Sequence, residues 1–576
     1  MDHFTPATDP IAGSVAVSAL VALIPLLTFI VLLAFVKTKA HVAGAWSLLA
    51  AVAVAVLGFH MPLGLAALSA SQGAVFGAFP VLWIVIMAVW LYRVTVISGR
   101  FEDLRGIFDV IGGRDVRVQA IIIAFCFGGL LEALAGFGAP VAITATMLIA
   151  LGLSPLRAAA TVLVANTAPV AFGAIAIPIT TAAGLTGLSA EHIGSVVGRQ
   201  APLLAVIVPL VLLFILDGRR GIRECWPVAI VMGLCFAVAQ FLASNYFSYE
   251  LTDVVASLVG LAGAFLFLRA WKSQGHAAAR ERLTVGAMAG GSASAGAALS
   301  EGSAATAGST AALTRTRVWL ALFPYLLVIV VFGFANLWKL GVNVPAWLAM
   351  TNVKVPWPVL HNAVVDAAGK PVSSTVYNFQ WLSSPGSLLL ATGLIVAAVY
   401  SVFDGGGRFP ITMRQAVADI GRTIYNMRWA GATILLVLAL AYVMNLSGQT
   451  VSIGTWLASA GGFFAFLSPV LGWLGTAVTG SDTSSNALFA KLQQAAGLKA
   501  GIDPHLLVAA NSSGGVVGKL ISPQNLAIAA TAVGMDGQES VILRKVIGWS
   551  VGMLLVLCIV VYLQSTPVLG WMLSGA

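Results

Sequence analysis

Residues 166–178 read NTAPVAFGAIAIP, and residues 511–523 read NSSGGVVGKLISP. Three pairs of residues in these stretches share one offset of 345 positions: Asn166 and Asn511, Gly173 and Gly518, and Pro178 and Pro523. Upstream, Gly136 and Gly480 repeat the pattern with an offset of 344 positions. The chain therefore contains an internal duplication. Each copy interrupts an apolar region with Gly, Pro and Asn, where a regular helix cannot continue and backbone polar groups need new partners.

The composition is that of a polytopic membrane protein. Of 576 residues, 59% are hydrophobic and 9% are charged, and the mean hydropathy is +0.97, which excludes a soluble globular protein. The net charge of +9 arises from short Lys and Arg clusters between apolar runs, a pattern typical of membrane topology and not of nucleic-acid binding. The four cysteines lie in or beside apolar runs, so we expect no disulfide framework, no metal and no cofactor.

Twelve apolar runs are long enough to cross a hydrocarbon core about 30 Å thick, which predicts an all-α fold with about twelve or more transmembrane helices. These runs are 11–36, 42–60, 76–97, 119–134, 200–217, 226–247, 251–271, 317–338, 385–403, 429–447, 451–478 and 546–564. Two broken regions, 135–190 and 479–535, are expected to form re-entrant hairpins. The Gly, Ala and Ser tract at 273–316 is expected to be a disordered cytoplasmic linker, and 339–384 an external loop.

Lys and Arg clusters set the orientation, with the clusters in the cytoplasm and both termini in the periplasm. The run at 76–97 is followed by a basic cluster, whereas its counterpart at 429–447 is preceded by one. The same reversal separates 200–217 from 546–564. We therefore predict inverted repeats, a hallmark of secondary transporters with a site near the membrane midplane. The predicted units are a first repeat at 1–247, a connecting helix at 248–272, the linker at 273–316 and a second repeat at 317–576.

Three ionisable residues stand out in the predicted membrane interior: Glu132, Asp482 and Lys519. A charge at this depth costs at least about 2.5–3.5 kcal/mol on insertion scales, so each needs a partner or a function. A packing salt bridge is one interpretation. In the other, Lys519 faces a substrate anion while Asp482 or Glu132 exchanges protons. Because one base cannot pair with two acids, one acid is left to carry a proton, and the sequence does not identify it.

Hydroxyl and amide side chains gather at the predicted breaks. The stretch TGSDTSSN at 479–486 is expected to cap a half-helix whose N–H groups attract an anion, although ordinary caps or small-residue packing are alternatives. The candidate substrate contacts, besides Lys519, are Asn166, Thr167, Ser481, Thr483, Ser484, Ser485, Asn486, Asn511, Ser512, Ser513, Ser522 and Gln524. The candidate hinge residues are Gly136, Gly138, Pro140, Gly173, Pro178, Gly480, Gly518 and Pro523. Ala174 stands opposite Lys519, so the second copy is expected to supply most polar contacts.

Several long stretches resemble the bacterial L-lactate permease family. They include FCFGGLLEALAGFGAPVAITA (125–145), LGWLGTAVTGSDTSSNALFA (471–490) and AANSSGGVVGKLISPQNLAIA (509–529). The resemblance implies proton symport of L-lactate, and often of D-lactate and glycolate, across a bacterial inner membrane. It also implies kinship with the ion transporter superfamily, whose members use inverted repeats, hairpins and elevator-like movement. The preferred substrate, the oligomeric state and the choice between an elevator and a rocking bundle stay open.

Two other functions remain in view. A sodium-coupled carboxylate transporter is the first, because the hydroxyls of 479–486 are able to coordinate Na⁺, but a single basic residue argues against a multiply charged substrate. A membrane-embedded enzyme or sensor is the second. It would need a nucleophile and base, a metal cluster or a signalling domain, and the only long polar insert is the linker at 273–316.

Overall fold

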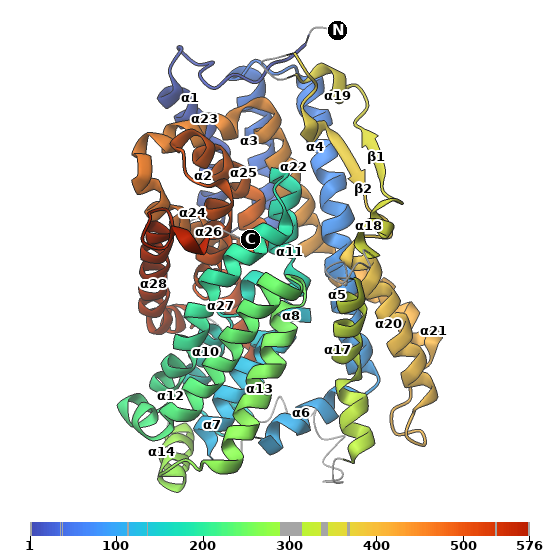
Figure 1. The fold of residues 1–576 in the computed structure, drawn as a ribbon, viewed down its shortest axis with the longest axis vertical. Coiled ribbons are helices and arrows are strands. Elements are labelled where there is room, and N and C mark those ends of the chain that lie inside the picture. The colour runs from blue at the N-terminus through green and yellow to red at the C-terminus, as the bar shows by residue number, and fades with distance from the viewer. Residues whose placement is uncertain are drawn as a thin grey trace.

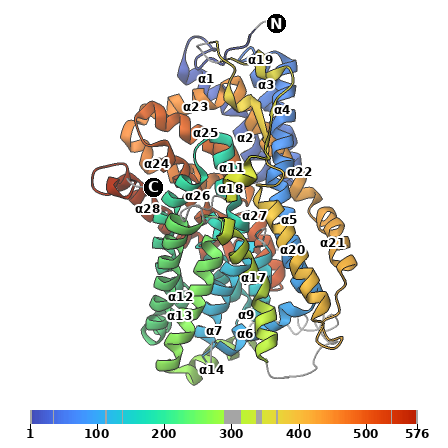
Figure 2. The ribbon, with the colours of Figure 1, turned by 45° about the vertical axis from the view of Figure 1, so that its right-hand side comes forward.

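The structure is a computed structural model that describes residues 3–34, 36, 38–111, 115–134, 136, 138–288, 314–335, 344–365, 369–535 and 538–573. Long helices run roughly along the vertical axis of Figure 1, and α12 and α13 lie on the opposite side from α5, α20 and α21 (Figures 1 and 2). The predicted class, an all-α membrane protein with broken helices, is confirmed. The described residues contain 10 helices long and apolar enough to span a membrane, or 11 if a bent pair counts as one span.

Apart from an isolated bridge between Phe4 and Val364, the regular secondary structure described in the first half of the chain is helical. Its helices are α1 (Val15–Ala22), α2 (Ile24–Ala34), α3 (Ala40–Leu57), α4 (Leu63–Phe76), α5 (Trp83–Ile97), α6 (Arg100–Ile111), α7 (Val116–Ile121), α8 (Gly128–Leu134), α9 (Ala139–Ala150), α10 (Pro155–Ala165), α11 (Gly173–Thr186), α12 (Ala190–Leu242) and α13 (Thr252–Ala270). Between α4 and α5 the backbone breaks at Phe79, whose φ of −143° and ψ of 122° are not helical. Wider π-helical turns at Ile122–Phe127 and Ala243–Phe247 continue α7 into α8 and α12 beyond its end.

The second half adds a small two-stranded sheet to the helices. Its helices are α14 (His276–Met288), α17 (Arg315–Ala335), α18 (Val344–Ala349), α19 (Leu360–Ala363), α20 (Pro385–Val402), α21 (Met413–Asn426), α22 (Arg428–Ser447), α23 (Gln449–Leu457), α24 (Phe464–Thr479), α25 (Asp482–Ala500), α26 (Pro504–Lys519), α27 (Pro523–Ala532) and α28 (Glu539–Gln564). Strands β1 (Val353–Pro356) and β2 (Val376–Phe379) pair antiparallel, with Val353 opposite Phe379, inside the segment predicted as an external loop.

Several boundaries differ from the prediction. Helix α4 was missed because Ser71, Gln72 and Gly73 interrupt the apolar pattern before residue 76. The runs at 200–217 and 226–247 are the two arms of α12, which turns back at Asp217 and Gly218, where the backbone angles are not helical. The arms pack side by side, because a Cβ on Gly233 would lie 3.0 Å from the Ala205 carbonyl oxygen, so the two predicted spans are two helices. Within the predicted disordered linker, residues 276–288 form α14, and residues 289–313 lie outside the described residues.

The first copy breaks where the sequence predicted. Helix α10 ends at Ala165 with Asn166 as its C-cap, a short 3-10 turn follows at Val170–Phe172, and the two helical segments bend by 61°. Ala174, Ile175 and Ala176 then adopt left-handed φ values of 46°, 58° and 54°. Left-handed backbone costs roughly 1–2 kcal/mol for each such residue. The surrounding fold must therefore hold this turn in place.

The second copy breaks inside the predicted region 479–535, between α24 and α25 and again between Lys519 and Pro523. Helix α26 runs unbroken to Lys519, so the expectation that Asn511, Ser512 and Ser513 lie at a break is wrong. Gly518, predicted as a hinge residue, is also helical, and a Cβ there would lie 2.3 Å from the Trp473 carbonyl oxygen. Its role in this structure is close packing. The two copies differ because Pro169 of the first copy lacks an N–H, whereas position 514 of the second copy is a glycine that a helix tolerates.

The two copies pack against each other reciprocally. By their place in the duplication, α9 corresponds to α25, α10 to α26, α11 to α27 and α12 to α28. Helix α9 contacts α27, and α11 contacts α25; likewise α10 contacts α28, and α12 contacts α26. Each contact thus has its equivalent with the copies exchanged. This arrangement brings the two breaks together in the middle of the molecule (Figure 1).

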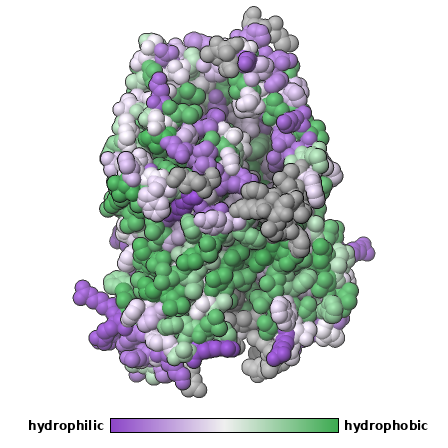
Figure 3. Space-filling view, in the orientation of Figure 1, coloured by the Kyte–Doolittle hydropathy of each residue, from purple (hydrophilic) through white to green (hydrophobic). Residues whose placement is uncertain are grey.

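The surface carries a broad apolar band. In Figure 3, hydrophobic residues cover much of the lower half of this face, with hydrophilic residues below the band and over much of the upper part. Large exposed side chains such as Leu203, Ile207 and Phe214 project from α12. A band of this kind suits contact with lipid chains.

Candidate functional site

A cavity of about 850 Å³ lies where the two breaks meet. Its walls come from α8, α22, the break before α11, the start of α25, the end of α26, and the first turns of α27 and α28. All three predicted ionisable residues line it: Glu132, Asp482 and Lys519. Apolar side chains, among them Val170 and Ile434, complete the wall. The fold therefore brings together charges that are far apart in the sequence.

Lys519 forms an ion pair with Glu132 across the two copies. The Lys519 Nζ to Glu132 Oε1 distance is 2.6 Å, and the two side chains are 9% and 3% exposed. Asn166 donates from Nδ2 to the second carboxylate oxygen, Oε2, at 2.9 Å. The salt-bridge interpretation of the sequence is therefore correct for this pair, and both oxygens of Glu132 have partners.

Two glycines lie against Glu132, and Gly173 makes room for its carboxylate. A Cβ on Gly173 would lie 2.9 Å from Glu132 Oε1, closer than normal van der Waals contact. Gly136 has φ +52°, and a Cβ there would lie 3.7 Å from the same oxygen. Both glycines were predicted as hinge residues. In this structure they form the surface against which Glu132 lies.

Asp482 is the acid left without a cation partner among the described residues. It is 3% exposed, accepts a 3.4 Å hydrogen bond from Thr476 at Oδ1, and has no hydrogen-bond partner at Oδ2. Gly515 lies directly beside it, because a Cβ at that position would be 1.9 Å from Asp482 Oδ1. Gly515 and Lys519 are one turn apart on α26, so Asp482 and Lys519 face the same side of that helix.

The start of α25 has the predicted half-helix cap. Gly480 ends α24 with φ +76°, and Ser481 accepts a 3.3 Å hydrogen bond from the Ser484 N–H. Ser481, Thr483 and Ser484 line the cavity, and Gln524 does so from α27. Hydroxyl groups and the N-terminal end of a helix thus face the cavity beside Asp482, an arrangement that favours anions.

The other predicted polar contacts are not part of the cavity wall. Asn486 donates to Ser512 Oγ at 2.7 Å, and Asn511 donates to Asn486 Oδ1 at 2.9 Å, so these residues join α25 to α26. Their bonds explain why a polar helix centre is stable when fully buried. Thr167 and Ser522 donate to the nearby Val164 and Lys519 carbonyls. Ser485 of α25 donates to the Gly472 carbonyl of α24, and Ser513 is fully buried.

The remaining hinge candidates occupy helix ends or the cavity wall. Gly138 precedes α9 with φ +85°, and Pro140 lies in the first turn of that helix. Pro523 begins α27, while Pro178 lies inside α11 just after the left-handed turn. Pro178 and Pro523 both line the cavity. The prolines thus border the site from equivalent positions of the two copies.

The open end of the cavity was not predicted from the sequence. Exposed Lys39, Trp429 and Ser540 line it, together with half-buried His41, whose ring stacks on Trp429 at a centroid distance of 4.4 Å. No sequence motif connects α3, α22 and α28, so these residues cannot be found without the fold.

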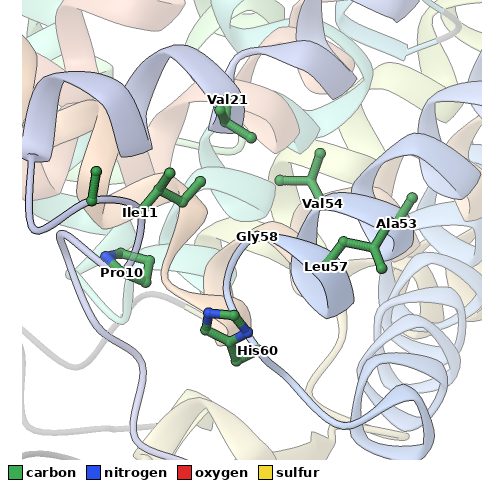
Figure 4. Close-up of a pocket in the computed structure, with 9 residues that line it drawn as sticks. Pro10, Ile11, Val21, Ala53, Val54, Leu57, Gly58 and His60 are labelled. Carbon is green, nitrogen blue, oxygen red and sulfur yellow. The ribbon is translucent and has the colours of Figure 1, made fainter.

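Two other features of the described residues lie apart from this cavity. An apolar pocket of about 540 Å³ beside the N-terminal segment is lined by Pro10, Val54 and Leu57 with His60 as its single ionisable group (Figure 4). His192, Asp503 and His505 have possible metal-ligating atoms within 4.8 Å of one another, but they do not line the cavity between the breaks. Neither feature combines anion-binding groups with buried acids.

Comparisons with known proteins agree along nearly the whole chain. The family described as L-lactate permease matches residues 18–568. A Bacillus subtilis (strain 168) protein named L-lactate permease is 41% identical, covering 99% of this chain and 100% of its own. An Escherichia coli (strain K12) protein named glycolate permease GlcA is 39% identical, covering 98% of each chain. The crystal structure of the Alcanivorax borkumensis YdaH transporter covers 80% of this chain and 88% of its own at 16% identity, and its TM-score of 0.29 supports no argument.

Proposed function

Because this chain belongs to the L-lactate permease family, we propose that it carries L-lactate, D-lactate and glycolate together with one proton across the bacterial inner membrane. It is a multi-pass membrane transporter and not an enzyme. The observation that carries the proposal is the buried ion pair of Lys519 and Glu132, which lines a cavity that also holds a second acid, Asp482.

Lys519 is the substrate's anchor in this proposal. A 2-hydroxy monocarboxylate has one carboxylate, one hydroxyl and a small apolar end. The carboxylate takes the place of Glu132 on Lys519, the hydroxyl bonds to Ser481, Thr483 or Ser484, and the apolar end lies against Val170 or Ile434. A single basic side chain at the buried end suits one negative charge.

Competition for Lys519 couples the proton to the substrate. In the empty carrier, Lys519 balances Glu132, and Asp482 is neutral because no other cation reaches it among the described residues. When lactate takes Lys519, Glu132 loses its counter-charge in a site where an unpaired charge is costly. Glu132 then binds one proton. The loaded site has the same net charge as the empty one, so transport is electroneutral and needs no metal or other cofactor.

The cavity opens toward the cytoplasm in this proposal. Lys39 and α28 line its exposed end, and the basic clusters at Lys37 and Lys39 and at Arg544 and Lys545 are those predicted to be cytoplasmic. The same orientation puts both termini in the periplasm. A membrane-impermeant thiol reagent should label Trp429→Cys in inside-out vesicles and not in right-side-out vesicles, and the reverse result would overturn this orientation.

The coupling is tested with purified protein in proteoliposomes. An inward proton gradient should drive lactate accumulation, a protonophore should abolish it, and a clamped membrane potential should carry no lactate-dependent current. Uptake that requires sodium would replace the proposal with the sodium-coupled carboxylate transporter. A clear current would contradict 1:1 coupling.

A further inference from the structure

Asp253 is a buried carboxyl that does not line the cavity and has no part in the proposed transport cycle. It lies in the first turn of α13 and is 0% exposed. Its Oδ1 accepts a 3.0 Å hydrogen bond from Gln240 of α12, and its Oδ2 has no hydrogen-bond partner. No Lys, Arg or His of the described chain pairs with it. The sequence reading missed it because it falls at the edge of an apolar run.

We propose that Asp253 is a permanent proton-binding site, holding a neutral carboxylic acid in a two-bond ring with the side-chain amide of Gln240. The amide nitrogen has two hydrogens: one is donated to Asp253 Oδ1, and the other to the Ala168 carbonyl at 3.2 Å. The amide oxygen Oε1 is also buried without a donor. A proton on Asp253 Oδ2 supplies the missing donor and satisfies both orphaned oxygens at once.

An ionised Asp253 leaves two buried acceptors without a donor, its own Oδ2 and the Oε1 of Gln240. The field of α13 favours a negative charge in its first turn, which is the argument for ionisation. Against it, Gln240 is fully buried, and the neighbouring charge that acts on Asp253 is the like charge of Glu132 on α8. A lone carboxylate at zero exposure with only one amide donor is the less stable arrangement.

Hydrogen bonds connect the ring of Asp253 and Gln240 to the proposed transport site. Gln240 donates a hydrogen bond to the Ala168 carbonyl inside the first break. Two residues earlier, Asn166 donates to the Glu132 carboxylate, which also accepts from Lys519. Asp253 is therefore a positioning residue: it fixes the amide that fixes the break.

Infrared difference spectroscopy tests the proton directly. Spectra of purified protein without substrate, compared with Asp253→Asn at neutral pH, should show a protonated carboxyl band that shifts in D₂O and disappears in the variant. The matched control is Asp503→Asn, because Asp503 bonds to His505 and is 33% exposed. This control should remove a carboxylate band and no protonated band. A carboxylate band at Asp253 as well would overturn the proposal.

Conservative replacement gives the second readout. Asn reproduces the donor and acceptor of a neutral acid, so Asp253→Asn should keep the melting temperature and lactate exchange of the parent. Asp253→Leu should melt at a lower temperature and lose lactate exchange. Equal loss in both variants would overturn the proposal. If Asp253→Asn does not fold, Asp253→Glu should show a displaced protonated band, and its absence would decide against the proton. None of the spectra depends on lactate transport, so failure of the proposed function would leave this test intact.

Discussion

Replacing Glu132 by Gln should separate the structural and transport roles of the buried ion pair. The substitution leaves Lys519 charged at 9% exposure, with its 2.6 Å partner neutral. Breaking a buried pair from one side typically costs about 3–5 kcal/mol, since one charge is left uncompensated. The empty variant should therefore melt well below the parent protein. Gln at this position also imitates a permanently protonated Glu132.

Lactate should then compensate for the missing charge. In Glu132→Gln the substrate carboxylate meets a lysine with no competitor, so lactate should raise the melting temperature more than it does in the parent, where Glu132 must be displaced first. The variant should exchange labelled lactate across proteoliposomes but fail to accumulate it from a proton gradient, because no group gains a proton on loading.

Thermal melts with and without lactate, run beside counterflow and gradient-driven uptake, measure all three effects. The double variant Lys519→Met with Glu132→Gln is the control: it should regain stability, since replacing both charges of a buried pair is often near neutral, yet show no exchange. Gradient-driven accumulation by Glu132→Gln, or lactate exchange by the double variant, would refute the reasoning.

Gly515→Ala should abolish uptake, because its Cβ would lie 1.9 Å from Asp482 Oδ1, whereas Gly552→Ala, with nothing within 4 Å, should leave uptake unchanged. Ser481→Ala removes the cap of α25 and should lower stability by about 0.5–2 kcal/mol, measured by thermal denaturation. Deletion of 289–313 should retain lactate uptake in vesicles, and a loss of uptake with normal membrane insertion would assign that segment a role in transport.

The sequence predicted the features that depend on composition and repetition. Apolar runs located most helices, and the offset of 345 residues located the breaks, because Gly and Pro act on the local backbone wherever they occur. The cost of a charge in lipid also singled out Glu132, Asp482 and Lys519, which line one cavity in the structure. These inferences need no knowledge of which helices touch.

Contacts between distant elements were beyond the reach of the sequence. The pairing of Lys519 with Glu132 spans 387 positions, and nothing local distinguishes it from a pairing with Asp482. The amides of Asn486 and Asn511 looked like substrate contacts because their chemistry suits a carboxylate. The fold satisfies them with each other instead, since α25 and α26 face each other there.

The departures from symmetry also explain why one copy carries the charge. At offset positions, Ala174 begins a left-handed turn in the first copy, whereas Lys519 ends a regular helix in the second. A lysine at the end of α26 has its ammonium on a rigid helix, where the negative end of the helix dipole also favours a cation. Ala174 lies on a turn that three strained residues maintain, a backbone suited to changing shape. In the proposed transport cycle, the second copy therefore offers the substrate carboxylate a cation on a rigid helix. The first copy carries Glu132 beside the strained turn at 174–176, and in that cycle the release of Lys519 to a substrate carboxylate is linked to movement of this turn.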